Sequence, residues 1–200
     1  MTANATFRIA FWVLFGLVLV MRVYFTSKTR RAGERVMPDQ AAIQREGKAM
    51  FAARVVGFFL LMGFLVMYAV RPDWVETLSI PIPDWLRWAG FALGLGSLAL
   101  WTWVQVALGK QWSAQLQLRD EHHLVTTGPY SRVRHPLYTA MFGYALSLAL
   151  VTANWIFVIL TLAMSLGMAA RVPREEQMMI EAFGEEYRGY VHRSGRFFPK

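Results

Sequence analysis

The chain has no cysteine and few charged residues, which make up 17% of its 200 positions. The absence of cysteine excludes disulfide bonds, zinc sites built from thiolates and cysteine nucleophiles. The four histidines, at positions 122, 123, 135 and 192, form no HExxH pattern and so give no support to a metal site. GxSxG and P-loop patterns are missing as well.

Hydrophobic residues dominate what is present. They account for 56% of the chain, which also has eight tryptophans and a mean hydropathy of +0.32. This composition is typical of an integral membrane protein and leaves little room for a separate soluble domain. The net charge of +8 does not indicate a nucleic-acid partner, because no reading module accompanies it.

Five apolar segments predict an all-α integral membrane protein with about five transmembrane helices. A spanning helix needs about 20 apolar residues. The last two segments are short, and only Thr152, Ala153 and Asn154 separate them, which predicts a helical hairpin. We interpret the first segment as a retained helix, since no cleavage pattern follows it. The segments are residues 7–25, 51–70, 88–108, 136–152 and 155–170.

The distribution of lysine and arginine predicts the orientation in the membrane. Alternate segments between the apolar runs carry 18 basic residues on one side and 3 on the other. This is the positive-inside pattern. It places the N-terminus outside, and the 109–135 loop and the C-terminus in the cytoplasm, with a plasma or inner membrane as the expected location.

Glycines in the third segment predict close helix packing. Gly90 and Gly94 form a GxxxG pair, and Gly96 follows. Small residues at this spacing let two membrane helices approach each other closely. A glycine-rich face can also admit a ligand to the backbone, but packing is the more common role.

Two polar segments next to the apolar runs are the candidate functional region. Residues 122–138 hold three His, two Arg and two Tyr, and residues 171–176 hold two Arg and two Glu. Ionisable residues at the edge of a bilayer are costly and indicate function. Pro136 suits the first turn of the fourth helix, and Pro173 suits the start of an amphipathic C-terminal helix over 174–192.

The order and spacing of these motifs resemble the isoprenylcysteine carboxyl methyltransferase family and the wider group that includes phospholipid N-methyltransferases. The resemblance covers roughly residues 109–199. On this basis we treat 1–108 as a three-helix membrane region and 109–200 as the catalytic region, together one domain. The motifs are HxLVxxGxY at 122–130, RHPxY at 134–138, an arginine shortly before the acidic pair 175–176, and FGEEYxxY at 183–190.

The resemblance implies methyl transfer from S-adenosyl-L-methionine to a lipophilic acceptor at the membrane. It places Arg171 opposite the acceptor, as a substrate-binding and catalytic residue, and gives His135 a catalytic role as well as a cofactor contact. No metal and no nucleic acid is expected, and the oligomeric state is left open. The cofactor contacts it implies are Gln115, His122, His123, Leu124, Val125, Tyr130, His135, Pro136, Leu137, Tyr138 and Glu175.

The chemistry of the acceptor leaves several alternatives. Our first hypothesis is O-methylation of a prenylcysteine-like or lipid carboxylate, which Arg171 would orient and which needs no base because it is already ionised. N-methylation of a phospholipid amine would need a base, for which His135 or Glu176 is the candidate. S-methylation of a lipophilic thiol, an NADPH-dependent reductase of the sterol type and a non-catalytic membrane scaffold are the other hypotheses.

Overall fold

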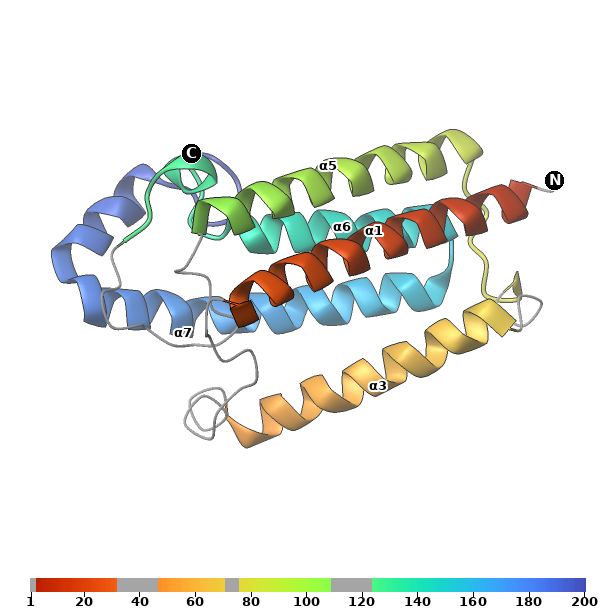
Figure 1. Ribbon diagram of the computed structural model, residues 1–200, viewed down its shortest axis with the longest axis horizontal. Helices are drawn as coiled ribbons and strands as arrows, with labels where there is room; N and C mark the ends of the chain where they lie inside the picture. The colour runs from red at the N-terminus through yellow and green to blue at the C-terminus, as the bar shows by residue number, and fades with distance from the viewer. Residues whose placement is uncertain (1–2, 32–46, 71–75, 109–123) are drawn as a thin grey trace.

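The computed structural model describes residues 3–31, 47–70, 76–108 and 124–200 (Figure 1). Within these ranges the regular structure is helical, apart from two isolated β-bridges. The prediction of an all-α fold is therefore confirmed. The elements are α1 (Ala3–Arg31), α3 (Lys48–Val70), α5 (Asp84–Leu108), the 3-10 helix η2 (Gly128–Ser131), α6 (Pro136–Thr152) and α7 (Trp155–Arg193).

Helices α1, α3, α5 and α7 are long and apolar enough to cross a membrane, whereas α6 has 17 residues and is shorter. A helix satisfies its backbone hydrogen bonds within its own segment, as the interior of a bilayer requires. Many apolar side chains of these helices remain exposed, for example Val20 and Leu166 at about 70%. The chain is thus an integral membrane protein, as its composition predicts.

Helices α5 and α6 approach each other closely through small residues, and α1 lies alongside them (Figure 1). A Cβ atom added at Gly90 would lie 2.5 Å from the Cβ of Leu150, and one at Gly94 would lie 2.8 Å from both Ser147 Oγ and a Leu14 methyl group. Neither position has room for a side chain. The packing role predicted for the glycine pair is confirmed.

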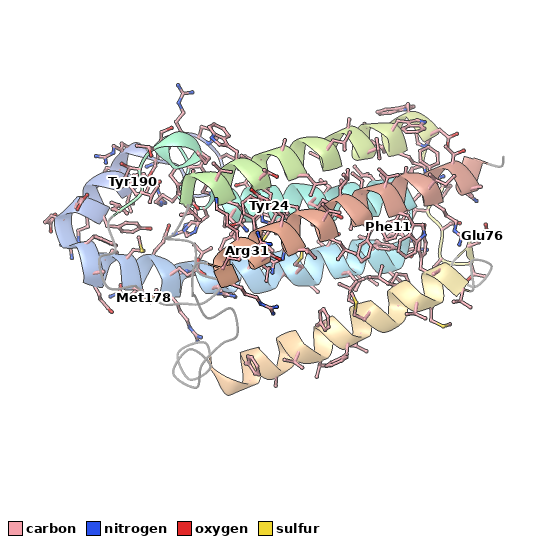
Figure 2. The ribbon with its side chains drawn as sticks, in the orientation of Figure 1. Phe11, Tyr24, Arg31, Glu76, Met178 and Tyr190 are labelled. Carbon is pink, nitrogen blue, oxygen red and sulfur yellow. The ribbon has the colours of Figure 1, made fainter. Side chains whose placement is uncertain are left out.

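An aromatic cluster joins α1, α3 and α7. Phe11 is fully buried in it, and Figure 2 shows this residue among the side chains between the helices. Its ring lies 4.8 Å from that of Tyr68 and 5.2 Å from that of Phe157. Leu65 and Tyr68 are buried, but Leu60 is 67% exposed, so α3 joins the bundle through its C-terminal part. Toward its other end α3 diverges from the bundle (Figure 1).

The predicted hairpin between the last two apolar segments is confirmed, and its turn is capped on both sides. Ala153 ends α6 in the left-handed conformation, with φ of 47°. Asn154 begins α7, and its side chain accepts a hydrogen bond from the N–H of Ile156 at 2.9 Å. The segment before α5 is also tied to this turn, since the N–H of Ile80 donates to the carbonyl of Ala153 at 2.7 Å.

The C-terminal helix does not begin at Pro173, which corrects the prediction. Helix α7 continues through Pro173, and its break lies at Gly184, where φ is 51° and ψ is −123°. A proline removes one backbone hydrogen bond from a helix but does not always end it. The positive φ at Gly184 is accessible to glycine and reverses the chain. The end of α7 therefore folds back toward η2 (Figure 1).

Candidate functional site

The candidate site lies at the end of the bundle where α7 folds back. The start of α6, η2, the part of α7 beyond its apolar run and the C-terminal segment meet there, and the labelled Tyr190 lies in this region (Figure 2). Glu76 lies at the opposite end of the molecule (Figure 2). The described part of the first polar segment, residues 124–138, and the second polar segment, residues 171–176, are thus brought into one place.

Backbone hydrogen bonds fasten the C-terminal segment to the residues that precede α6. The N–H of Arg134 donates to the carbonyl of Gly195 at 2.9 Å, and the N–H of His135 donates to the carbonyl of Arg196 at 3.0 Å. The N–H of Gly195 in turn donates to the carbonyl of Arg132 at 2.9 Å. A Cβ atom at Gly195 would overlap the carbonyl oxygen of Phe198, so the turn that follows this backbone pairing requires glycine.

Tyr190 anchors the returning end of α7 to the segment around η2. Its buried hydroxyl lies 2.5 Å from the carbonyl oxygen of Tyr130 and 3.2 Å from that of Val133. Burial raises the pKa of Tyr190 to about 12. The hydroxyl therefore stays protonated near neutral pH and remains a hydrogen-bond donor.

Glu176 is held by two arginines and a histidine. Its Oε1 accepts from Arg134 Nε at 3.0 Å and lies 3.4 Å from His135 Nε2, while its Oε2 accepts from Arg196 Nη2 at 2.5 Å. Burial acts to raise the pKa of Glu176, but the hydrogen bonds from His135, Arg196 and Arg134 outweigh it and hold this pKa well below its usual range. Glu176 is therefore ionised at neutral pH.

The neighbouring Glu175 faces a different set of partners. Its Oε1 accepts from the Tyr138 hydroxyl at 2.5 Å and lies 3.4 Å from Arg171 Nη2. Its Oε2 lies 3.7 Å from His135 Nδ1. The structure thus brings together four of the residues that the sequence assigns to the site. These are Tyr138 in α6, Arg171 and Glu175 in α7, and His135, which directly precedes α6.

Aromatic rings line this cluster. The rings of His135 and Tyr138 are stacked, with centroids 5.6 Å apart and an interplanar angle of 9°. The Phe197 ring lies 6.1 Å from that of His135 and 5.3 Å from that of Phe142. Carboxylates and a guanidinium therefore border a partly apolar surface, a combination typical of small-molecule sites.

The remaining predicted residues lie around this centre. Pro136 is buried in the first turn of α6, as predicted, and Leu137 packs against the hydrophobic core. Leu124 and Val125 are half-buried in the segment that leads to η2, which contains Tyr130. Gln115, His122 and His123 lie outside the described residues.

The contribution of the C-terminal segment, residues 194–200, is not visible in the sequence motifs. Arg134 is part of the RHPxY motif, but nothing in the sequence indicates that it binds Glu176 or the carbonyl of Val191, 3.1 Å from its Nη1. Arg196 and Phe197 belong to no motif. The signal that could have found them is Gly184, because a glycine inside an amphipathic helix can mark the point where the chain reverses.

Comparison with protein families supports the resemblance seen in the motifs. The sequence profile of the isoprenylcysteine carboxyl methyltransferase (ICMT) family matches residues 91–181. This range contains most of α5, η2, α6 and the first part of α7, including Arg171 and Glu175. The predicted resemblance to this family is confirmed.

Individual relatives match a similar part of the chain. The nickel-cobalt-cadmium resistance protein NccN of Alcaligenes xylosoxydans xylosoxydans is 33% identical over an alignment of 114 positions, which covers 50% of this chain and 53% of that protein. Protein-S-isoprenylcysteine O-methyltransferase of Dictyostelium discoideum is 31% identical over an alignment of 132 positions, which covers 54% of this chain and 53% of that protein. The chain thus spans about half the length of these curated relatives.

A solved structure extends the likeness over almost the whole fold. The structure of the eukaryotic intramembrane Ras methyltransferase ICMT superposes with a TM-score of 0.58, at 20% identity, and covers 95% of this chain and 67% of that one. The arrangement of helices described above is therefore shared with that protein. At this level of identity the likeness concerns the fold.

Proposed function

We propose that this protein is an S-adenosyl-L-methionine-dependent methyltransferase that O-methylates a prenylcysteine-like or lipid carboxylate at the cytoplasmic face of the membrane. The observation that carries the proposal is the contact of Glu175 with Tyr138 and Arg171, beside His135. These residues match the motif positions that the family uses for cofactor and acceptor. Both the profile match and the shared fold support the proposal.

The residues present fit the proposed cofactor. A carboxylate has about four acceptor positions, and Tyr138 and Arg171 both contact the same oxygen of Glu175. The other oxygen can therefore accept hydrogen bonds from cofactor hydroxyl or amino groups. The cofactor, when bound, supplies a methyl group that a positive sulfonium already activates. The residues proposed to hold it are those assigned above, from Gln115 to Glu175.

Arg171 is proposed to bind and orient the acceptor carboxylate. A guanidinium has five donors in a fixed fork, and the contact with Glu175 at 3.4 Å engages Nη2. The same side chain can therefore touch the cofactor-binding carboxylate and the acceptor. Holding two reactants in line supplies on the order of 7 to 11 kcal/mol when the geometry is ideal, so Arg171 acts by positioning.

The state of Glu176 favours a carboxylate acceptor over an amine. A base for an amine must take up a proton, and the hydrogen bonds of Glu176 hold its pKa well below its usual range. Both ring nitrogens of His135, the other candidate, face carboxylate oxygens at 3.4 and 3.7 Å. A carboxylate acceptor is ionised near neutral pH and needs no base. No observation favours the thiol, reductase or scaffold hypotheses.

The proposal is tested by transfer of an isotope-labelled methyl group in detergent or lipid nanodiscs. Three acceptors are compared: a farnesylated cysteine analogue, phosphatidylethanolamine and a lipophilic thiol. We expect label on the cysteine analogue, released as methanol by alkali because the product is an ester. Alkali-stable label on the amine or the thiol would contradict the carboxylate assignment, and no transfer to any acceptor would contradict the methyltransferase proposal.

A further inference from the structure

We infer that the C-terminal residues 194–200 complete the site and that Arg196 is a positioning residue, which orients His135 through Glu176. The inference rests on the proposed function and deepens it. It follows from three sets of contacts: those of Arg196 with Glu176, those of Glu176 with His135, and those that dock the segment itself.

Arg196 fixes the rotation of the Glu176 carboxylate. Arg134 and His135 both contact Oε1, at 3.0 and 3.4 Å, and contacts to one oxygen leave the group able to turn about its bond. Arg196 holds Oε2 at 2.5 Å through Nη2, and its Nε also lies 3.3 Å from Oε1. Such a two-point contact is the geometry that a guanidinium provides and an ammonium does not.

The orientation of Glu176 is transmitted to the reacting side of the site by His135. This ring lies between the two adjacent carboxylates, with Nε2 toward Glu176 and Nδ1 toward Glu175. Glu175 in turn contacts Arg171 at 3.4 Å. A turn of the Glu176 carboxylate therefore releases the ring that borders the residues proposed to hold cofactor and acceptor.

The docking of the segment places Arg196 and covers His135. The hydroxyl of Thr139 donates to the carbonyl of Phe197 at 2.6 Å, and the Phe197 ring lies against the His135 ring. The Arg196 side chain is 50% exposed, and exposed ion pairs contribute little to stability. Arg196 is thus expected to matter more for the geometry of the site than for folding.

The test compares Arg196→Gln with the control variant Arg188→Gln. The control removes an exposed ion pair between Arg188 and Glu185, both of which lie on α7. We measure the affinity for S-adenosylhomocysteine by calorimetry, kcat for methyl transfer and the melting temperature. Arg196→Gln should lower affinity and kcat on the order of tenfold, as for a lost hydrogen bond to a charged group. Its melting temperature should equal that of the control variant Arg188→Gln. Arg196→Lys should recover part of the loss.

The pH profile separates positioning from a structural role. Removing Arg196 takes away an interaction that favours ionised Glu176, so the acid limb of the activity should move to higher pH in Arg196→Gln. The inference would be overturned if Arg196→Gln had the affinity, kcat and pH profile of the wild type. It would also be overturned if the variant differed from the wild type only in a lower melting temperature. If the variant does not fold, Arg196→Lys decides: wild-type kinetics overturn the inference, and a loss at an unchanged melting temperature supports it.

Failure of the inference and failure of the proposed function give different results. A wild-type protein that binds neither S-adenosylmethionine nor S-adenosylhomocysteine overturns the proposed function, and with it the inference. A wild-type protein that binds and methylates, beside an Arg196→Gln variant that does so equally well, overturns the inference alone.

Discussion

Two adjacent glutamates occupy different environments and support different roles. Glu176 is held by Arg134 and Arg196, whereas Glu175 meets Tyr138 and Arg171. The first is 12% and the second 20% exposed at the side chain. Because neighbouring residues on a helix point in directions about 100° apart, one carboxylate turns toward the docked C-terminus and the other toward the proposed site.

Arg171→Ala should lower kcat far more than cofactor affinity. If Arg171 orients the acceptor, the variant loses a charge-assisted contact made to the reacting carboxylate, and a loss of about 10- to 100-fold in kcat/KM is expected from about 1.5 to 3 kcal/mol. The measurement pairs methyl-transfer kinetics with calorimetric cofactor binding. A variant with normal kcat and weakened cofactor binding would assign Arg171 to the cofactor instead.

Glu176 should make the stability of the protein depend on pH in acid. Its pKa is lowered by folding, so its contribution is complete above the unfolded value of about 4.3 and is lost as pH falls below it. At neutral pH, Glu176→Gln should cost on the order of 3 kcal/mol, because it leaves the buried Arg134 uncompensated.

The difference between the melting temperatures of wild type and Glu176→Gln should therefore shrink between pH 7 and pH 3, because below pH about 4.3 the unfolded wild type takes up a proton on Glu176 that the folded protein does not hold. Glu186→Gln, at an exposed position of α7, is the matched control and should follow the wild type throughout. A gap that stays constant over this pH range would show that Glu176 does not contribute as a carboxylate.

At the scale of elements, the sequence predicts the helices well and their continuation poorly. The boundaries of α6 match the expected 136–152, because Pro136 and the 152–154 turn mark both ends. The continuation of α7 through Pro173 and its break at Gly184 were missed. Proline and glycine change only the local free energy of the helical conformation. The fold-back is stabilised by contacts with residues distant in the sequence, such as Tyr130 and Arg134, and hydrophobic periodicity does not reveal these contacts.

The residues that meet at the candidate site can be predicted only in part, because some of their contacts depend on how distant segments fold together. Tyr138, Arg171 and Glu175 belong to motifs whose order and spacing are visible in the sequence, and the structure brings them together. Arg196 carries no such signal, since its role depends on where a reversed segment docks. Its contact with Glu176 crosses 20 residues and a change of chain direction.

The packing of α5 against α6 leads to a test with an internal control. Gly90→Ala should destabilise the protein, because the new Cβ would lie 2.5 Å from the Cβ of Leu150; overpacking of this kind typically costs about 1 to 3 kcal/mol. Gly96→Ala, on the same helix with nothing within 4 Å, should be neutral or stabilising by up to about 1 kcal/mol. Thermal unfolding in detergent measures both, and equal melting temperatures would contradict this account of the interface.

At the scale of the whole molecule, basic residues gather at the end of the bundle that holds the site. The last turn of α1 has Lys28, Arg30 and Arg31, and the folded-back part of the chain adds Arg134 and Arg196. Figure 2 places Arg31 toward this end and Glu76 at the other. This arrangement supports the proposed orientation, with the site in the cytoplasm.

The absence of native cysteine makes that orientation simple to measure. Glu76→Cys should react with a membrane-impermeant maleimide on intact cells, because its end of the molecule is predicted to face outside. Glu185→Cys, at an exposed position beside the Gly184 break, should react only after permeabilisation. The opposite pattern of labelling would invert the proposed topology.

The cluster around Glu175 is proposed to bind S-adenosyl-L-methionine. Calorimetry on detergent-purified protein, with S-adenosylmethionine, S-adenosylhomocysteine and NADPH as ligands, tests it most directly. We expect the wild type to bind the first two ligands and not NADPH, and Glu175→Gln to bind them much more weakly at an unchanged melting temperature. Binding of NADPH alone, or equal affinity in the variant, would contradict it.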